Sequence, residues 1–406
     1  MIARLDINKY YGQHVEISGR VTEDVDMTKG TIRMKLDDLQ VNGTEQSGVV
    51  WTSVGESKLA KQILRSDRVI LEGMLDAGFA TFNGVSYRAE IKKVIREDNA
   101  DIARDFRDWF ADGVRKVIPE PEASLGVGYL VGQKRGLPDD LTEALMIVGL
   151  THIVVASGYN LTILVRLARR LFEKVSRYMA LAASSTLVLA FMFVAGFSPS
   201  MTRAGLVAGL SLVVWFYGRN IHPVVLLFFA AAISILIEPS YIWGDVGWLL
   251  SFGSFAGVLI LAPLLQSYFF GEARPSILRQ VVGETLSAQL ATLPLIMFIF
   301  GTVSYVAIIA NVLVLPLIPL AMLLVFLCGI LSFIFMPLAA LVAIPTTWLL
   351  QYMVWVANGL SSFSWSYQEI SISFAMAVLL YLTLTALIFW LWRGTHLRLE
   401  RTNIVE

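Results

Sequence analysis

Polar residues that interrupt long apolar stretches are the side chains of this sequence most able to handle a ligand inside a membrane. In the stretch THIVVASGYNLTIL, His152 and Asn160 lie eight residues apart, with Ser157 and Gly158 between them. A polar group at membrane depth is costly unless it has a partner or faces a water-filled path, so such residues are candidates for lining or gating one. The other candidates of this kind are Arg203, Asp245, Ser251, Gln289 and Asn311.

Each of these candidates also has a purely structural explanation. Serine and glycine let neighbouring helices approach closely, and amides such as Gln289 and Asn311 form hydrogen bonds between helices. Arg203 could extend its guanidinium to the membrane surface, and Asp245 could cap the helix that follows it. The sequence leaves both explanations open.

Catalytic and metal-binding chemistry has little support in the sequence. The four histidines show neither the H-x-H nor the H-E-x-x-H spacing, and the single cysteine, Cys328, excludes an intrachain disulfide and a cysteine metal cluster. The glycines form no G-x-x-x-x-G-K-[ST] motif for a nucleotide. We therefore expect no enzyme activity, no metal site and no cofactor.

The elements that position these residues fall into two parts, because charged residues are concentrated in the first third of the chain. Of the 406 residues, 56% are apolar and 16% are charged, and the stretch from Thr285 to Gln368 contains no Asp, Glu, Lys or Arg. Soluble domains carry about 25% charged residues. A membrane accounts for so long an uncharged stretch, since a charge inside the bilayer is expensive.

The charged N-terminal part alternates apolar and polar residues, which is the pattern of half-buried β-strands. Five strands with a short helix after the third predict an all-β, OB-like barrel domain over residues 1–97, although other small barrels share this order. The predicted strands are 14–23, 32–41, 49–54, 69–75 and 85–95, and the predicted helix is 56–64.

An amphipathic helix and a linker are predicted over residues 98–121, between the barrel and the membrane part. Ile102, Phe106, Phe110 and Val114 recur at helical spacing, with charged residues elsewhere around the helix. We expect this helix to lie in the membrane interface, and packing on the barrel is the alternative.

The remaining chain, residues 122–406, predicts an α-helical polytopic membrane domain. Its apolar stretches are near the ~20 residues that span a bilayer, and they predict about nine to eleven transmembrane segments, some of them broken. Irregular backbone is expected at Ser157–Gly158, around Asn311 and Pro316, and at Gly244–Gly247, where a span rich in small residues begins. The stretches are 141–171, 178–197, 201–217, 223–237, 246–265, 282–300, 305–335, 338–360 and 372–392.

Basic residues are distributed unevenly between the predicted loops. The loop after the first stretch contains Arg166, Arg169, Arg170, Lys174 and Arg177, whereas the loops predicted on the other side contain no Lys or Arg. The positive-inside rule then predicts a cytoplasmic C-terminus and a barrel outside the cytoplasm. Because the chain begins without a signal peptide, we expect a fragment of a longer protein; a hairpin-like first segment with a cytoplasmic barrel is the alternative.

Three stretches of the membrane part, in order between residues 124 and 320, carry a family signature. They are LTEALMIVGLTHIVVASGYNLTILV, SPSMTRAGLVAGLSLVVWFYGRNIHP with EPSYIWGDVGWLLSFGSFAGVL, and LSAQLATLPLIMFIFGTVSYVAIIANVLVLPL. These stretches resemble the ComEC-type competence proteins, channels of the bacterial cytoplasmic membrane through which single-stranded DNA enters during natural transformation. The resemblance implies membrane lipids, a DNA receptor and a helicase-type ATPase as partners.

The sequence departs from that family in three places. The usual I-S-G-L-H is A-S-G-Y-N at 156–160, so Asn160 replaces a histidine, and the frequent G-D is G-Q at 132–133. Many members also have a C-terminal metallo-β-lactamase-like nuclease domain, whereas this short form ends at Glu406 without one. The resemblance therefore implies that the nuclease is either a separate protein or a part of the gene not present in this sequence.

The resemblance also implies that the barrel engages DNA. Basic residues suit phosphates and aromatic rings suit bases, although an ordinary solvated strand face is the alternative for each residue. The candidates are Arg33, Lys35, Phe82, Tyr87, Arg88, Lys92 and Lys93. The hypothesis is thus a channel that translocates single-stranded DNA, driven by a partner ATPase or the proton gradient. The competing hypotheses are a transporter of small solutes or lipids with a soluble binding domain, and a receptor-like scaffold.

Overall fold

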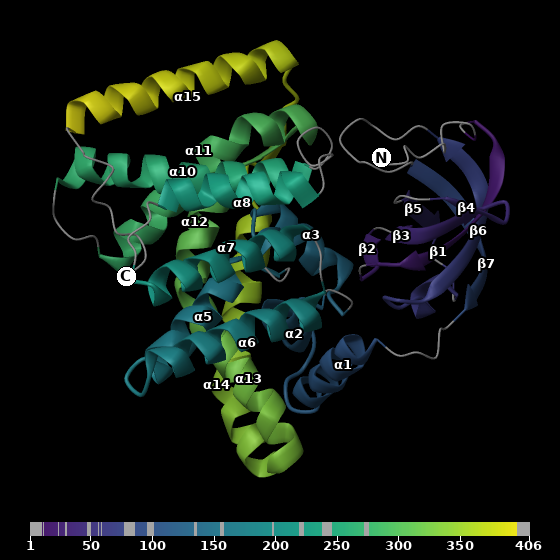
Figure 1. Ribbon diagram of the computed structural model, residues 1–406. Helices are drawn as coiled ribbons and strands as arrows, with labels where there is room; N and C mark the ends of the chain where they lie inside the picture. The colour runs from purple at the N-terminus through teal and green to yellow at the C-terminus, as the bar shows by residue number, and fades with distance from the viewer. Residues whose placement is uncertain are drawn as a thin grey trace.

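The structure is a computed structural model that joins a β-barrel to a larger helical part (Figure 1). β1 to β7 form the barrel, and α1 to α15 follow it along the chain. The described residues are 10, 12–22, 24–28, 31–46, 50–55, 57, 59–76, 86–95, 101–133, 136–154, 158–196, 199–218, 223–237, 246–271 and 276–395.

Five long strands close the barrel. β1 pairs with β3, β3 with β5, β5 with β7, β7 with β6, and β6 again with β1; only the β5–β7 pair is parallel. The predicted small all-β domain is therefore confirmed. The strands are β1 (His14–Val21), β2 (Asp26–Thr28), β3 (Thr31–Val41), β4 (Thr44–Gln46), β5 (Val50–Gly55), β6 (Arg68–Asp76) and β7 (Ser86–Ile95). The described part of the predicted helix 56–64 contains a short 3-10 turn, η2 (Ala60–Gln62).

Alternation along β3 shows how the sequence builds the barrel core. Ile32, Met34 and Leu36 point inward and are buried. Burying such a side chain contributes roughly 1.5–3 kcal/mol. Because successive strand residues face opposite sides, the same alternation puts Arg33 and Lys35 on the outer surface.

The helical part confirms the predicted polytopic membrane domain. Six elements of the described chain are long and apolar enough to cross a membrane (α6, α10, α11, α12 with α13, α14 and α15), and α7 and α8 are shorter apolar helices. The helices are α1 (Ile102–Arg115), α2 (Glu122–Val131), α3 (Asp139–Ile147), α4 (Thr151–Val154), α5 (Gly158–Phe172), α6 (Arg177–Ala195), α7 (Pro199–Phe216), α8 (Pro223–Ile237), α10 (Val246–Phe270), α11 (Ile277–Ile299), α12 (Ala307–Val314), α13 (Ile318–Ile334), α14 (Met336–Ser361) and α15 (Phe374–Thr395). A two-stranded sheet, β8 (Thr302–Ser304) with β9 (Tyr367–Glu369), joins the segments before α12 and α15.

Two of the predicted spans are interrupted in the structure. The first, 141–171, is divided among α3, α4 and α5, and Gly149 takes a left-handed φ of 71° after α3. The long stretch 305–335 is interrupted by the 3-10 turn η3 (Leu315–Leu317). Pro316 lies within this turn, and proline cannot donate the backbone hydrogen bond that a continuous α-helix requires.

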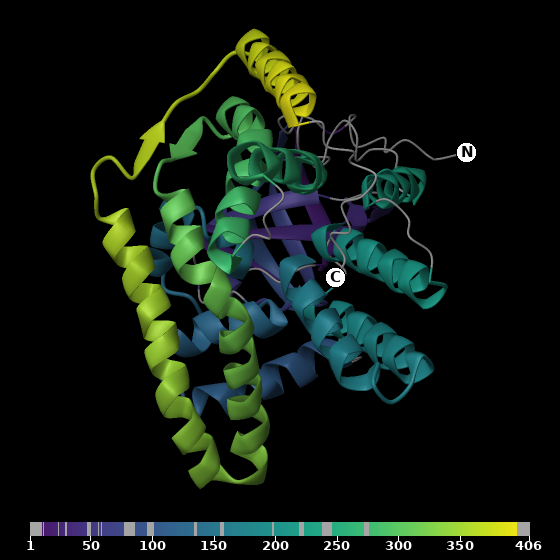
Figure 2. The same cartoon turned by 90° about the vertical axis from the view of Figure 1, so that its left-hand side faces the viewer.

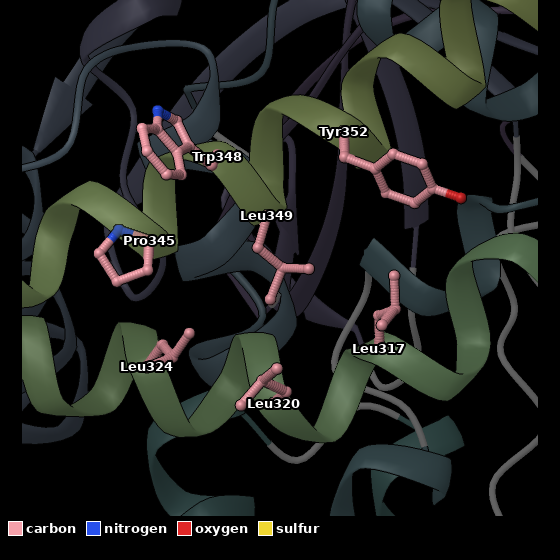
Figure 3. A pocket seen from close by; sticks show the side chains of 7 residues that line it. All are labelled: Leu317, Leu320, Leu324, Pro345, Trp348, Leu349 and Tyr352. Carbon is pink, nitrogen blue, oxygen red and sulfur yellow. The ribbon is translucent and has the colours of Figure 1, made fainter.

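The α13–α14 hairpin packs into the central apolar core of the helical part, to which the segments from α1 to α4 also contribute. It runs across the direction of α10 and α15 (Figures 1 and 2) and packs against α1, α2, α3 and α12. A hollow of about 440 Å³ lies between α13 and α14 (Figure 3). Its lining is Leu317, Leu320, Leu324, Pro345, Trp348, Leu349 and Tyr352, so it offers apolar surface rather than groups for catalysis.

Candidate nucleic-acid interface and membrane path

A basic and aromatic face lies on the outer surface of β3 and β5. In the strand register, Arg33 pairs with Ser53, and Lys35 pairs with Trp51. The Nζ atom of Lys35 lies 5.6 Å from the centroid of the half-buried Trp51 ring, within cation–π range. A positive charge beside an indole ring is the combination that holds a phosphate and stacks a base.

The face continues onto β7. Ser53 pairs with Arg88 in the parallel register, so Arg33, Ser53 and Arg88 form one row across three strands. Arg33 is exposed and makes no ion pair with a described residue. Tyr87 and Arg88 are described by their places in the strand, and Phe82 lies outside the described residues. A groove of about 930 Å³ on the barrel is lined in part by His14, Arg33, Ser53, Glu72 and Lys92.

Lys92 differs from Arg33 because carboxylates neutralise it. Its Nζ atom forms an ion pair with Glu72 and lies 3.7 Å from Glu16. The hydrogen bond to Glu72 raises the pKa of Lys92, and the same bond lowers the pKa of Glu72. Two carboxylates outnumber one ammonium here, so the β1–β6–β7 side is less suited to phosphate than the β3–β5 side. Lys93 is exposed and has no ion pair with a described residue.

Buried arginines join the barrel to α1. Arg107 is 2% exposed and forms ion pairs with Asp24 of the barrel and, at 3.1 Å, with Asp108. Arg104 is also buried, donates from Nη1 to the backbone oxygen of Arg65 at 2.7 Å and lies 3.8 Å from Asp67. Sequence reasoning missed this junction, although two arginines three residues apart on one helix face were a signal for it.

Asp101 closes the same junction at the start of α1. It accepts hydrogen bonds from Arg65 Nε at 2.6 Å and from the backbone nitrogen of Arg104 at 3.0 Å, which makes it the N-cap of the helix. Burial disfavours the charged carboxylate, but the bonds from Arg65 and Arg104 outweigh it and hold the pKa of Asp101 below its usual range.

The network extends from α1 to the segment after α2. The side-chain amide of Gln133 donates from Nε2 to Asp108 at 2.6 Å, and its Oε1 atom accepts a hydrogen bond from Arg115 at 2.8 Å. The buried Gln133 therefore connects the middle of α1 to its C-terminal end.

The apolar residues of α1 face two environments. Phe110 is buried against Phe326 and Gly329 of α13, and Trp109 stacks on Phe333 at 3.8 Å. Phe106 remains 53% exposed. The helix thus packs against both the barrel and the membrane part, and it also exposes apolar surface.

One group of the candidate membrane residues gathers where α2, α5, α7 and α10 meet. Asn160 is fully buried and donates to the Tyr129 carbonyl at 2.9 Å. A Cβ at Gly158 would lie 3.1 Å from Ala204, beside the buried Arg203. Arg203 Nη2 donates at 2.9 Å to the carbonyl of Gly247, which lies one helical turn before the half-buried Ser251. The polar side chains of this group could hold a polar ligand or stabilise a break in a helix.

A second group lies in the middle of α11 and on α12. Gln289 donates to the Ser304 carbonyl at 3.3 Å, and Asn311 is 6% exposed, with no described hydrogen-bond partner for its side-chain oxygen. Among the described residues no hydrogen bond joins this group to the first. His152 is exposed on α4 and belongs to neither group, and Ser157 and Asp245 lie outside the described residues.

Comparison with known proteins places this arrangement in a family. The sequence model of the competence protein family matches residues 129–394, well over half of the chain. The chain belongs to the competence protein family. It is a multi-pass membrane protein of that family, and the barrel domain precedes the matched region.

Two relatives match about half of this competence protein. ComE operon protein 3 of Bacillus subtilis (strain 168) is 24% identical over 208 residues, which is 49% of this chain and 25% of the relative. An uncharacterized protein of Aquifex aeolicus (strain VF5) is 25% identical over 199 residues, which is 48% of this chain and 45% of the relative. The matches thus span less than half the length of either relative. No solved structure matches the chain.

Proposed function

We propose that this protein translocates single-stranded DNA across the cytoplasmic membrane during natural transformation. Membership of the competence protein family supports a role in DNA uptake. The observation that carries the proposal is the β3–β5 face, where Arg33 and Lys35 flank Trp51 on a barrel beside the membrane helices. Single-stranded nucleic acid is bound by just this pairing of basic groups with an aromatic platform.

The barrel topology supports an OB-type assignment. Five strands form a closed ring that contains one parallel pair, β5 with β7. In an OB fold, the second and third strands form the face that binds oligonucleotides. β3 and β5 are the second and third long strands of this barrel, so the fold and the basic face point to the same surface.

The membrane residues then have a role that follows from their surroundings. Asn160 and Arg203 are buried polar groups bound to backbone carbonyls at helix ends. Asn160, Gln289 and Asn311 would give the moving strand neutral amide contacts, and Arg203 would add a single positive charge. A path with so few charges binds DNA weakly, which suits a ligand that must keep moving. A DNA receptor, a helicase-type ATPase and a separate nuclease would act with the channel.

The proposed orientation has the barrel outside and the C-terminus in the cytoplasm. In Figure 1 the turn between α5 and α6 and the C-terminal end of α15 lie on the left, and the barrel lies on the right. The turn is rich in arginine, and basic loops are retained on the cytoplasmic side. The barrel would therefore meet DNA before it enters the membrane.

Binding of a fluorescent single-stranded oligonucleotide to the purified full chain tests the barrel face. We expect the Trp51→Ala and Arg33→Ala changes to weaken binding by about 1–3 kcal/mol each, and Arg33→Ala to lower the salt dependence by about one phosphate contact. Lys92→Ala is the matched control, because its charge is already neutralised. Salt-independent binding, or an equal loss from Lys92→Ala, would contradict the assignment.

DNA uptake in a transformable host tests the channel itself. Deletion of the gene should abolish transformation, and complementation with Asn160→Ala or Arg203→Ala should fail although the protein reaches the membrane in normal amounts. Normal transformation after deletion would reject the proposal and favour a transporter of small solutes or lipids. Normal transformation by the two variants would assign those residues to helix packing.

A further inference from the structure

The turn between α5 and α6 lies beside the C-terminal end of α7, and the two form an unusual arginine cluster. The guanidinium carbons of Arg169 and Arg177 each lie 5.5 Å from the centroid of the Trp215 ring. Arg177 also donates from Nη2 to the Trp215 carbonyl at 3.1 Å. The distance between the two guanidinium carbons therefore cannot exceed the sum of their distances to the Trp215 ring centroid. We name Arg169, Arg177 and Trp215 the tryptophan clamp.

The clamp has an unbalanced positive charge. Neither arginine forms an ion pair with a carboxylate in the described chain. The Nε atom of Arg169 is buried and has no hydrogen-bond partner among the described residues. Two guanidiniums that share one ring repel each other, so an anion between or beside them would remove the repulsion and use the remaining N–H donors.

The surroundings add more positive charge. Arg166, Arg170 and Lys174 are exposed on the same turn, and Glu173 is the one acidic residue from 158 to 196. A guanidinium presents a planar fork of donors that matches the oxygens of a phosphate group. The chemical class of ligand that fits the clamp is therefore a phosphate ester.

The exposed apolar rim decides which phosphate ester the clamp would meet. Leu171 is 62% exposed, Tyr178 is 75% exposed and Tyr217 is 72% exposed, all within a few residues of the clamp. Aromatic and basic residues beside exposed aliphatic side chains are typical of a helix end at the membrane–water interface. A nucleic acid would leave this apolar surface in water, whereas a phospholipid covers it with acyl chains.

We propose that the tryptophan clamp binds the phosphate headgroup of an anionic phospholipid. The acyl chains lie along the exposed apolar residues of α5 and α6, and the phosphate oxygens accept hydrogen bonds from Arg169 and Arg177. This site anchors the basic end of the helical part at one depth in the membrane. The proposal does not depend on DNA translocation.

Native mass spectrometry of the purified full chain in detergent tests the site, with short-chain phosphatidylglycerol and short-chain phosphatidylcholine as probes. The wild-type chain should retain phosphatidylglycerol preferentially. The double variant Arg169→Gln with Arg177→Gln should bind phosphatidylglycerol roughly tenfold or more weakly, because each basic residue at an anionic surface contributes substantially to lipid attraction. The matched control, Arg166→Gln with Lys174→Gln, removes equal charge from the same turn and should lose much less.

Three outcomes would overturn the proposal. Equal losses in the two double variants would show a diffuse basic surface without a site, and equal retention of both lipids would show that the phosphate charge is not recognised. Displacement of phosphatidylglycerol by a single-stranded oligonucleotide would assign the clamp to nucleic acid. If the double variant does not fold, Trp215→Phe serves instead, since it keeps a ring and should still weaken phosphatidylglycerol retention more than the control does.

Discussion

Arginine residues at two regions of the molecule have opposite kinds of partner. At the junction between the barrel and α1, Arg65, Arg104 and Arg107 are buried and each lies within ion-pair distance of a carboxylate. At the basic ends of the helices, arginines lie over aromatic rings. The ring-stacked arginines are Arg169 and Arg177 on Trp215, Arg279 on Phe270 and Arg393 on Phe389.

The difference follows from access to water. A buried guanidinium loses its hydration, so only a carboxylate in good geometry compensates the loss. An arginine at an exposed helix end keeps much of its hydration, and an aromatic ring face attracts it only modestly. The N–H groups at the edge of the guanidinium remain able to donate hydrogen bonds. The junction is therefore built to hold two parts of the protein together, and the basic ends are built to attract anions.

Removal of Arg107 should have the largest effect on stability. The Arg107→Ala change leaves the carboxylates of Asp24 and Asp108 without their buried partner, and breaking a buried pair costs about 3–5 kcal/mol. Amide hydrogen exchange of α1 in the purified chain measures this loss as faster exchange. Lys93→Ala, an exposed change without an ion pair in the described chain, is the control; equal exchange in both variants would show that the junction contributes no net stability.

Acidification should weaken the junction by a smaller amount. The folded-state pKa of Asp101 lies below its ordinary value of 3.8, so its stabilising effect is complete above that value and is lost as pH falls through the lower folded value. Thermal unfolding of the wild-type chain between about pH 5 and about pH 3 should therefore show a decline that the Asp101→Asn variant shows less strongly. Equal declines of thermal stability in the wild-type chain and the variant would show that Asp101 does not contribute to the loss of stability at low pH.

Removal of a ring-stacked arginine should have the smallest effect on stability. Arg279 lies 4.8 Å from the Phe270 ring and forms no ion pair in the described chain. The Arg279→Gln change should alter the free energy of unfolding by about 1 kcal/mol or less, as exposed cation–π pairs do. Chemical denaturation in detergent measures this change in the free energy of unfolding. A loss of stability as large as that of Arg107→Ala would show that the two regions do not differ in this respect.

Local patterns explain why much of the fold was predictable. The period-2 alternation in the N-terminal part predicted the barrel strands and put Arg33 and Lys35 outside, because a strand's two faces are set by its own sequence. Long uncharged stretches predicted the membrane helices, because a charge in hydrocarbon is costly and its exclusion from a stretch is visible in the composition of that stretch. Pro316 likewise predicted an interruption that the structure shows at η3.

The two-part architecture and the polar residues within apolar stretches could thus be read from the chain alone. The partners of those residues depend on how the elements pack. Trp51 meets Lys35 because two strands align in register, and Arg107 is buried because α1 returns to Asp24, 83 residues earlier in the chain. Arg203 reaches the Gly247 carbonyl 44 residues away for the same reason. Such contacts depend on how separate elements pack, and no local pattern carries that information.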